Sequence, residues 1–143
     1  MAQTLRISEG ASIAMHALIH LAEKNGLPVS NAAIAEAFRV SANHSSKVMQ
    51  RLLKSGFVQA VRGPGGGYTL ARDPKDVSLL EIYRAIDGEP VNTGCLFGRG
   101  KHCSLSTCLF AGLIRDTEEL VKKHLGSVTL ADYMSLNIAL EEK

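Results

Sequence analysis

The stretch that decides the fold is Ser41-Ala-Asn-His-Ser-Ser-Lys-Val-Met-Gln-Arg-Leu-Leu-Lys-Ser-Gly56. Its pattern predicts a helix over about Asn43 to Ser55, after a tight turn at residues 39–42, with Gly56 as a left-handed cap. The predicted helix has two unlike faces. The apolar face is formed by Val48, Met49, Leu52 and Leu53, and the opposite, basic face by His44, Lys47, Arg51 and Lys54. Such a helix can pack one side on a core and present the other to a polyanion.

The elements on either side of this helix predict its setting. In chain order they are a helix over residues 7–23, a short helix over 31–38 capped by Ser30, and two strands over 57–62 and 68–71 around a Gly-rich tip at 63–67. Helix, short helix, tight turn, basic helix and hairpin is the order of a winged helix-turn-helix. We therefore predict an α+β, mainly α, fold of that type.

The rest of the chain predicts three more helices. Ser78 and Glu81 form a capping box that opens a helix through Ile86, and Thr129 starts a last helix, Leu130 to Glu141. Between them a long helix runs from Leu105 to Leu125 and is closed by Gly126. One side of the long helix should be apolar and meet a partner; it carries Leu109, Leu113, Leu120 and Val121. We expect a DNA-binding domain over 1–90, a cysteine-bearing loop over 91–104, and a dimerisation part over 105–143.

Composition narrows the class of protein. The 143 residues are 45% hydrophobic and 21% charged, as in an ordinary soluble domain. No run is long and apolar enough for a membrane span, the first residues lack an apolar signal core, and three cysteines cannot pair completely. We therefore expect a cytoplasmic protein with no membrane partner. Residues 37–72 carry six cations and no acid, which favours a polyanionic partner, although a solvated basic surface has the same composition.

The basic helix and the hairpin supply candidate DNA contacts. His44, Lys47 and Arg51 can enter a major groove, and Ser41 and Asn43 at the helix N-terminus can hold a phosphate or read a base edge. At the hairpin, Arg62 can reach a minor groove, while Gly65, Gly66 and Gly67 allow the backbone to approach the sugar-phosphate wall. Each feature also has an ordinary reading, as a solvated helix face or a simple turn. Their occurrence together, in this order, favours double-stranded DNA.

Three cysteines form the other candidate site. Cys95, Cys103 and Cys108 have the spacing C-x7-C-x4-C within a Gly-containing segment. Thiolates bind iron–sulfur clusters and zinc, but no CxxC pair of the kind common in structural zinc sites is present. A metal-free thiol switch, or three unrelated thiols, would give the same sequence. We find none of the sequence motifs of catalytic sites, and we expect no enzyme activity.

Several of these residues resemble one known family. Leu53-Lys-Ser-Gly-Phe-Val58, then Val61-Arg-Gly-Pro-Gly-Gly-Gly-Tyr-Thr-Leu70, are similar to the helix end and wing of the Rrf-type (IscR/NsrR-like) winged-helix regulators. The resemblance continues through Arg6-Ile-Ser8, Val77-Ser-Leu79 and Ala85-Ile-Asp87 to the three cysteines. It implies a homodimeric transcription regulator that binds a two-fold symmetric DNA site. By position, the DNA contacts would be Ser41, Asn43, His44, Ser46, Lys47 and Arg62.

The resemblance also implies a cofactor and a mode of assembly. An iron–sulfur cluster, 2Fe–2S or 4Fe–4S, would be bound by the three cysteines, and the long helix would cross its twin in a dimer. The family's usual fourth ligands are replaced here by Ser12 and Ala111. This leaves His102, His16 and Glu9 as candidates. The expected function is a DNA-binding regulator, such as a repressor, that senses iron–sulfur, redox or nitric oxide status; the alternative is a metal-free repressor that responds to thiol oxidation or a small ligand.

Overall fold

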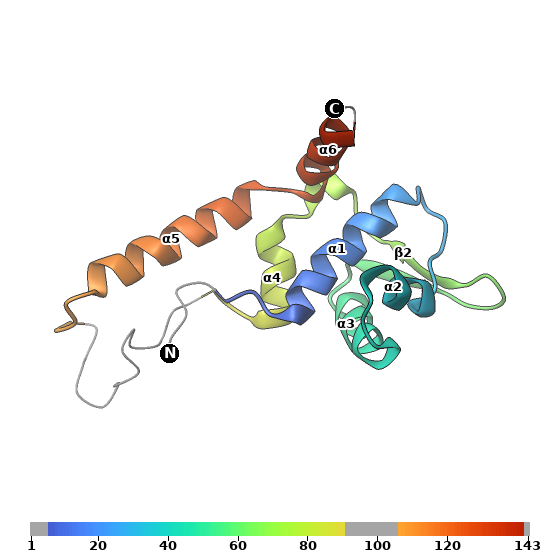
Figure 1. Ribbon diagram of the computed structural model, residues 1–143, viewed down its shortest axis with the longest axis horizontal. Coiled ribbons are helices and arrows are strands. Elements are labelled where there is room, and N and C mark those ends of the chain that lie inside the picture. The colour runs from blue at the N-terminus through green and yellow to red at the C-terminus, as the bar shows by residue number, and fades with distance from the viewer. Residues whose placement is uncertain (1–5, 91–105, 142–143) are drawn as a thin grey trace.

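The computed structural model describes residues 6–90 and 106–141. Most of the described chain is helical, with one two-stranded antiparallel sheet (Figure 1). The elements in chain order are α1 (Glu9–Glu23), α2 (Asn31–Phe38), α3 (Ala42–Lys54), β1 (Val58–Val61), β2 (Gly67–Leu70), the short 3-10 turn η1 (Pro74–Asp76), α4 (Leu79–Asp87), α5 (Ala111–Ser127) and α6 (Leu130–Glu141). The predicted winged helix-turn-helix order is confirmed.

Helix α1 is the centre of the core. Ser8 caps it, accepting a hydrogen bond from the Ala11 N–H at 3.0 Å, and Asn25 ends it by adopting a left-handed conformation. Most of its apolar side chains are buried, on several sides of the helix, so it packs against α3 and α4 at once. The core is aliphatic around it; fully buried larger side chains include Leu18, Leu21, Ile34, Met49, Leu52 and Ile82.

A buried polar pair fixes the angle between α2 and α3. Ser45 is fully buried, and its hydroxyl donates to the side-chain oxygen of Asn31 at 2.8 Å. The Asn31 amide in turn donates to the Ala42 carbonyl at 2.9 Å. The side chains of Ser45 and Asn31 thus both have hydrogen-bond partners within the helix-turn-helix. Their polar groups therefore do not destabilise the packing of α2 on α3. Arg39 closes α2 in a left-handed conformation.

The hairpin is attached through β2 to the connection between α1 and α2. β1 and β2 pair in the register Val58 to Leu70 and Val61 to Gly67. Val29 exchanges two backbone hydrogen bonds with Tyr68, at 3.0 and 2.9 Å, so it acts as a short third strand. The hairpin therefore has a fixed orientation relative to the helix-turn-helix.

The C-terminal helices are attached through a second pair of backbone hydrogen bonds. Leu79 N–H donates to the Val128 carbonyl, and Leu130 N–H donates to the Val77 carbonyl, each at 3.0 Å. This bridge fixes the α5–α6 junction beside the start of α4. From there, α5 extends away from the body formed by α1 to α4 (Figure 1).

The long helix differs from its prediction at both ends. It begins at Ala111 rather than Leu105, because residues 106–110 form turns and Phe110 caps the helix without a side-chain hydrogen bond. It also continues through Gly126 to Ser127. Gly126 lies within the helix beside α4, and a Cβ there would make an ordinary contact of 3.4 Å with Leu80, so this glycine does not end the helix.

Three side-chain predictions also differ from the structure. Val121 does not share the exposed side of Leu113 and Leu120; it is half-buried, in register with buried Ile114, because adjacent helical residues differ by about 100°. Leu109 is 90% exposed but precedes the helix. Leu53, predicted on the apolar face of α3, is 39% exposed.

Candidate nucleic-acid interface

The N-terminal half of α3 is held by the core and exposed on its outer side. Val48, Met49 and Leu52 are buried, whereas Asn43 and Lys47 are exposed. Ser41 is the N-cap: its hydroxyl accepts from the His44 N–H at 3.1 Å. Ser41 and Asn43 are exposed, so the positive end of the helix dipole lies at the surface. The exposed half of α3, from Ser41 to Lys47, is called the recognition face below.

Two further predicted contacts lie beside the recognition face. His44 is half-buried, and its Nδ1 lies 3.7 Å from a carboxylate oxygen of Glu9 at the start of α1. The two form an ion pair when His44 is protonated. Ser46 is half-buried and accepts from the Gln50 amide at 3.4 Å. Glu9 therefore adds a negative charge beside the N-terminal end of α3.

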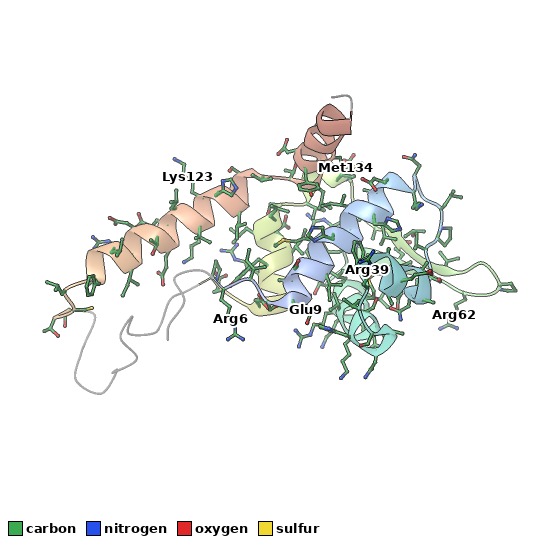
Figure 2. All side chains as sticks on the ribbon, viewed as in Figure 1. Arg6, Glu9, Arg39, Arg62, Lys123 and Met134 are labelled. Atoms are coloured by element: carbon green, nitrogen blue, oxygen red, sulfur yellow. The ribbon has the colours of Figure 1, made fainter. Side chains whose placement is uncertain are left out.

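The hairpin carries an exposed cation beside its tip. Arg62 directly follows β1, and its side chain points away from the hairpin into solvent (Figure 2). Close backbone packing shapes the tip. A Cβ on Gly66 would overlap the carbonyl oxygen of Val61, and Gly65 has φ of 72°, a conformation that favours glycine. The hairpin satisfies the geometric expectation for a wing.

Two of the six cations in the acid-free stretch have partners within the fold. Arg72 donates to the Glu81 carboxylate at 3.0 Å and to the Asp76 carbonyl, and its guanidinium lies 5.5 Å above the Phe57 ring. Arg51 donates through Nη1 to the Ile86 carbonyl, at the end of α4, at 3.0 Å. The basic surface available to a polyanion is smaller than the sequence indicates.

The pKa of Glu81, the carboxylate that pairs with Arg72, is lowered. The Ser78 backbone N–H donates to the Glu81 carboxylate and is the main reason that the pKa of Glu81 lies below its ordinary value. Partial burial opposes this shift, and the hydrogen bond and charge of Arg72 add to it. This confirms the predicted capping box at the start of α4.

The predicted cluster ligands are only partly described. Cys108 is half-buried and lies just before α5, whereas Cys95, Cys103 and His102 lie outside the described residues. Within residues 6–90 and 106–141, no group of three or more His, Cys, Asp or Glu side chains could hold a metal ion. Of the other candidate ligands, Glu9 lies beside His44.

His16, which we considered as a fourth ligand, is exposed on α1. Its Nδ1 lies 2.7 Å from the Ser12 carbonyl, and its ring centroid lies 6.1 Å from that of Phe38. The ring is therefore held against the start of its own helix and beside α2. These contacts do not require a metal.

Sequence reasoning missed the contacts that join distant segments. The Asn31–Ser45 pair, the Val29–Tyr68 bridge and the Arg51–Ile86 hydrogen bond were not predicted. The sequence does contain a signal for the Arg51–Ile86 hydrogen bond. Ile86 would normally pair its carbonyl with the N–H four residues on, and that residue is Pro90, which has none.

Comparison with known proteins agrees with this architecture. A model of the Rrf2 family, described as an iron-dependent transcriptional regulator, matches residues 7–135. The chain belongs to the Rrf2 family. It is 31% identical over 132 residues to the HTH-type transcriptional regulator IscR of Klebsiella pneumoniae (strain 342), covering 92% of this chain and 80% of the relative.

Solved structures of regulators have the same fold. The CymR global cysteine regulator of B. subtilis matches with a TM-score of 0.76 and 28% identity, over 92% of this chain and 98% of that one. T. potens IscR matches with a TM-score of 0.66 and 30% identity, over 92% and 87%. These relatives are transcription regulators, not enzymes. No helix in the described part of this Rrf2-family chain is long and apolar enough to cross a membrane.

Proposed function

We propose that this Rrf2-family regulator is a homodimer that reads a two-fold symmetric DNA operator with two copies of α3. One observation supports this most directly: Asn43 and Lys47 are exposed on a helix whose other side, Val48 and Leu52, is buried. A helix mounted in this way fits a major groove about 12 Å wide. The two-fold symmetry of a dimer would give a two-fold symmetric site.

Each predicted contact has a distinct role in this proposal. Lys47 donates to a guanine edge or a phosphate, while Ser41 and Asn43 act at the N-terminal end of α3, where the helix dipole favours a phosphate. Arg62 reaches from the wing into an adjacent minor groove, where narrow A·T tracts attract arginine. The close backbone of Gly65 and Gly66 lets the wing approach the strand. His44 and Ser46 lie next to Lys47 and complete the surface.

The dimer would form through α5. Leu113 and Leu120 are 53% and 66% exposed and lie seven residues apart, on one side of a helix that extends away from the body. Thr117 lies between them on that side, and its hydroxyl donates back to the Leu113 and Ile114 carbonyls. The exposed apolar residues of this side are therefore Leu113 and Leu120, and exposed His124 lies beside them. This supports the division into a DNA-binding part (1–90), a cysteine segment (91–104) and a dimerisation part (105–143).

We further propose that the regulator senses its signal through an iron–sulfur cluster bound by Cys95, Cys103 and Cys108. The donor type fits: thiolates are the usual ligands of iron–sulfur clusters, the three cysteines would supply three of the usual four, and the family is described as iron-dependent. When bound, such a cluster supplies a centre that responds to oxidants, nitric oxide or iron supply. Cys108 directly precedes the turn into α5, so its thiol would link the signal site to the dimerisation helix.

A second candidate is a metal-free thiol switch in the same cysteines. The similarity to a cysteine regulator, CymR, favours it, since that relative shares 28% identity over 92% of this chain. In this case oxidation would join two of the three thiols in a disulfide. The DNA-binding part of the proposal would be unchanged.

One experiment separates these functions. The full chain is purified without oxygen, its visible absorbance is recorded, and its affinity is measured for a duplex selected from a random-sequence pool. We expect a brown protein that selects a two-fold symmetric sequence. Cys→Ala at any of the three positions should remove the colour and change DNA affinity while the dimer stays folded. A colourless protein whose affinity changes on oxidation would support the thiol switch, and failure to select any sequence would contradict the DNA-binding proposal.

A further inference from the structure

The C-terminal end of α4 is the point at which three helices meet. The Arg51 guanidinium of α3 donates to the Ile86 carbonyl, and the Ser8 hydroxyl at the N-terminus of α1 donates to the Asp87 carboxylate. A Cβ at Gly10 of α1 would lie 3.3 Å from the Ile86 side chain, so α1 and α4 also pack closely here. Residues of α1 and α3 thus both contact Ile86 and Asp87 at the end of α4.

The Ile86 carbonyl has a particular need for Arg51. It belongs to the last turn of α4, where carbonyls have no partner inside the helix, and the residue that could have supplied an N–H is Pro90. The neighbouring Gly88 N–H is already used by the Arg84 carbonyl at 3.1 Å. A cation at this negative end of the helix dipole is also electrostatically favoured. The Arg51 contact is therefore explained by the fold itself.

Arg51 is placed unlike Lys47, although both were predicted from the same basic face. Lys47 is exposed in the first half of α3, where helix-turn-helix proteins read bases, whereas Arg51 is in the last turn and reaches toward α4. The recognition face is held by its buried side chains and by the Asn31–Ser45 pair at its N-terminal end. Arg51 provides the matching attachment at the C-terminal end.

We propose that Arg51 is a positioning residue that sets the orientation of α3 by fastening it to the end of α4, and that it does not contact DNA. The inference rests on the proposed function of α3 as the DNA-reading helix. If α3 is tilted wrongly, base contacts by Lys47 and Asn43 lose their geometry, whereas sequence-independent attraction to the phosphates is unaffected. A substitution at a positioning residue should therefore lower the affinity for the specific DNA site alone. A substitution at a phosphate contact should lower the affinity for specific and non-specific DNA alike.

The test compares four variants of the full chain. Arg51→Met removes charge and donors but keeps most of the stem, and Arg51→Lys restores a cationic donor. Lys54→Met is the matched control, because Lys54 is an exposed cation in the same last turn. Lys47→Ala reports on the recognition face. Affinities for the selected duplex and for an unrelated duplex are measured over a range of salt concentrations, together with backbone amide NMR shifts of Asp87 and Gly88 and the thermal midpoint.

We expect Arg51→Met to weaken binding to the selected duplex about tenfold, the effect of losing one charge-assisted hydrogen bond. Affinity for the unrelated duplex and the salt slope should stay as in Lys54→Met. The Asp87 amide shift should change, because that N–H shares a peptide group with the Ile86 carbonyl. Arg51→Lys should recover much of the affinity and of the shift.

Three results would overturn the inference. An equal loss of affinity on both duplexes, with a salt slope reduced by about one, would make Arg51 a phosphate contact. Unchanged affinity on both duplexes would leave it without a role in binding. A lowered thermal midpoint with unchanged affinity would make it only a stabilising residue. If Lys47→Ala also had no effect on either duplex, the proposed function of α3 itself would fail.

Discussion

The hydroxyl of Ser8 donates to the carboxylate of Asp87 although the two residues are 79 positions apart. The Ser8 N–H donates to the second carboxylate oxygen at 3.0 Å, and the same hydroxyl accepts from the Ala11 N–H as the N-cap of α1. One serine therefore caps one helix and binds the end of another. Nearby, the Tyr83 hydroxyl donates to the Arg6 carbonyl at 2.8 Å. Burial is the main reason that the pKa of Tyr83 is raised, and the charge of Asp87 adds to it.

Asp87→Ala should destabilise the protein by about 1 kcal/mol, because it leaves the Ser8 N–H and hydroxyl without their carboxylate and loosens the α1 cap. Urea unfolding at neutral pH measures the loss. Glu89→Ala is the control, since Glu89 forms an exposed ion pair with Arg84 at 2.7 Å, and such pairs contribute little. Equal losses in the two variants would contradict the role assigned to Asp87.

Ser45→Ala should cost about 1 kcal/mol, because the fully buried Ser45 hydroxyl is lost and the half-buried Asn31 side-chain oxygen loses its donor. The thermal midpoint and the free energy of unfolding measure this. Ser46→Ala, one residue further along α3, is the control: Ser46 is only half-buried, and its hydroxyl accepts a long bond of 3.4 Å. We expect a change within about 0.5 kcal/mol for that variant.

Most helix ends could be predicted because they depend on local signals. Ser30, the Ser78–Glu81 capping box and the Thr129–Asp132 pair each satisfy orphan N–H groups within a few residues of themselves, and the helices begin where these residues predict. The start of α5 has no such cap, and its predicted position is six residues too early. A hydrophobic pattern locates a helix but does not set its first turn.

The candidate site was predictable only in part. The sequence shows a row of cationic residues. It does not distinguish a cation that hydrogen-bonds within the protein from one that contacts DNA. Arg51 finds an acceptor on α4 35 residues further along the chain, and Arg72 finds one on the same helix nine residues along. Ser8–Asp87 and Val29–Tyr68 are likewise long-range contacts. No local periodicity encodes them, so only the folded chain reveals which charges remain available.

Glu81→Gln should make stability less sensitive to acid. The pKa of Glu81 is lowered in the folded state, so its carboxylate contributes stability that is present above the unfolded pKa, near 4.5, and is lost as the pH falls through the lower, folded value. Because Glu81 is 42% exposed, we expect the contribution to be below about 1 kcal/mol. Urea unfolding between pH 7 and pH 3 measures it. A wild-type acid dependence that persists unchanged in Glu81→Gln would contradict this account.

Gly66→Ala should disrupt the wing, because the new Cβ would overlap the Val61 carbonyl and also lie 2.8 Å from the Gly63 carbonyl. We expect weaker binding to the selected duplex, most for sequences with A·T-rich flanks, where Arg62 would act. Gly26→Asn, outside the wing, is the control. A Cβ at Gly26 meets no atom within 4 Å, and asparagine tolerates its positive φ better than other side chains. Normal binding by Gly66→Ala would remove the wing from the proposed interface.

Leu120→Lys should weaken the dimer. Leu120 is 66% exposed and shares the outer side of α5 with Leu113, so a dimer formed there would bury a charge without a partner. Sedimentation velocity at micromolar concentration should show a monomer, or a dimer that dissociates on dilution. Glu119→Gln adds one unit of positive charge, as Leu120→Lys does, at the neighbouring exposed position about 100° away around the helix, and should leave the dimer intact. If both variants remained dimers at every concentration, the two chains would associate through another surface, and the spacing of the two α3 helices would have to be set there.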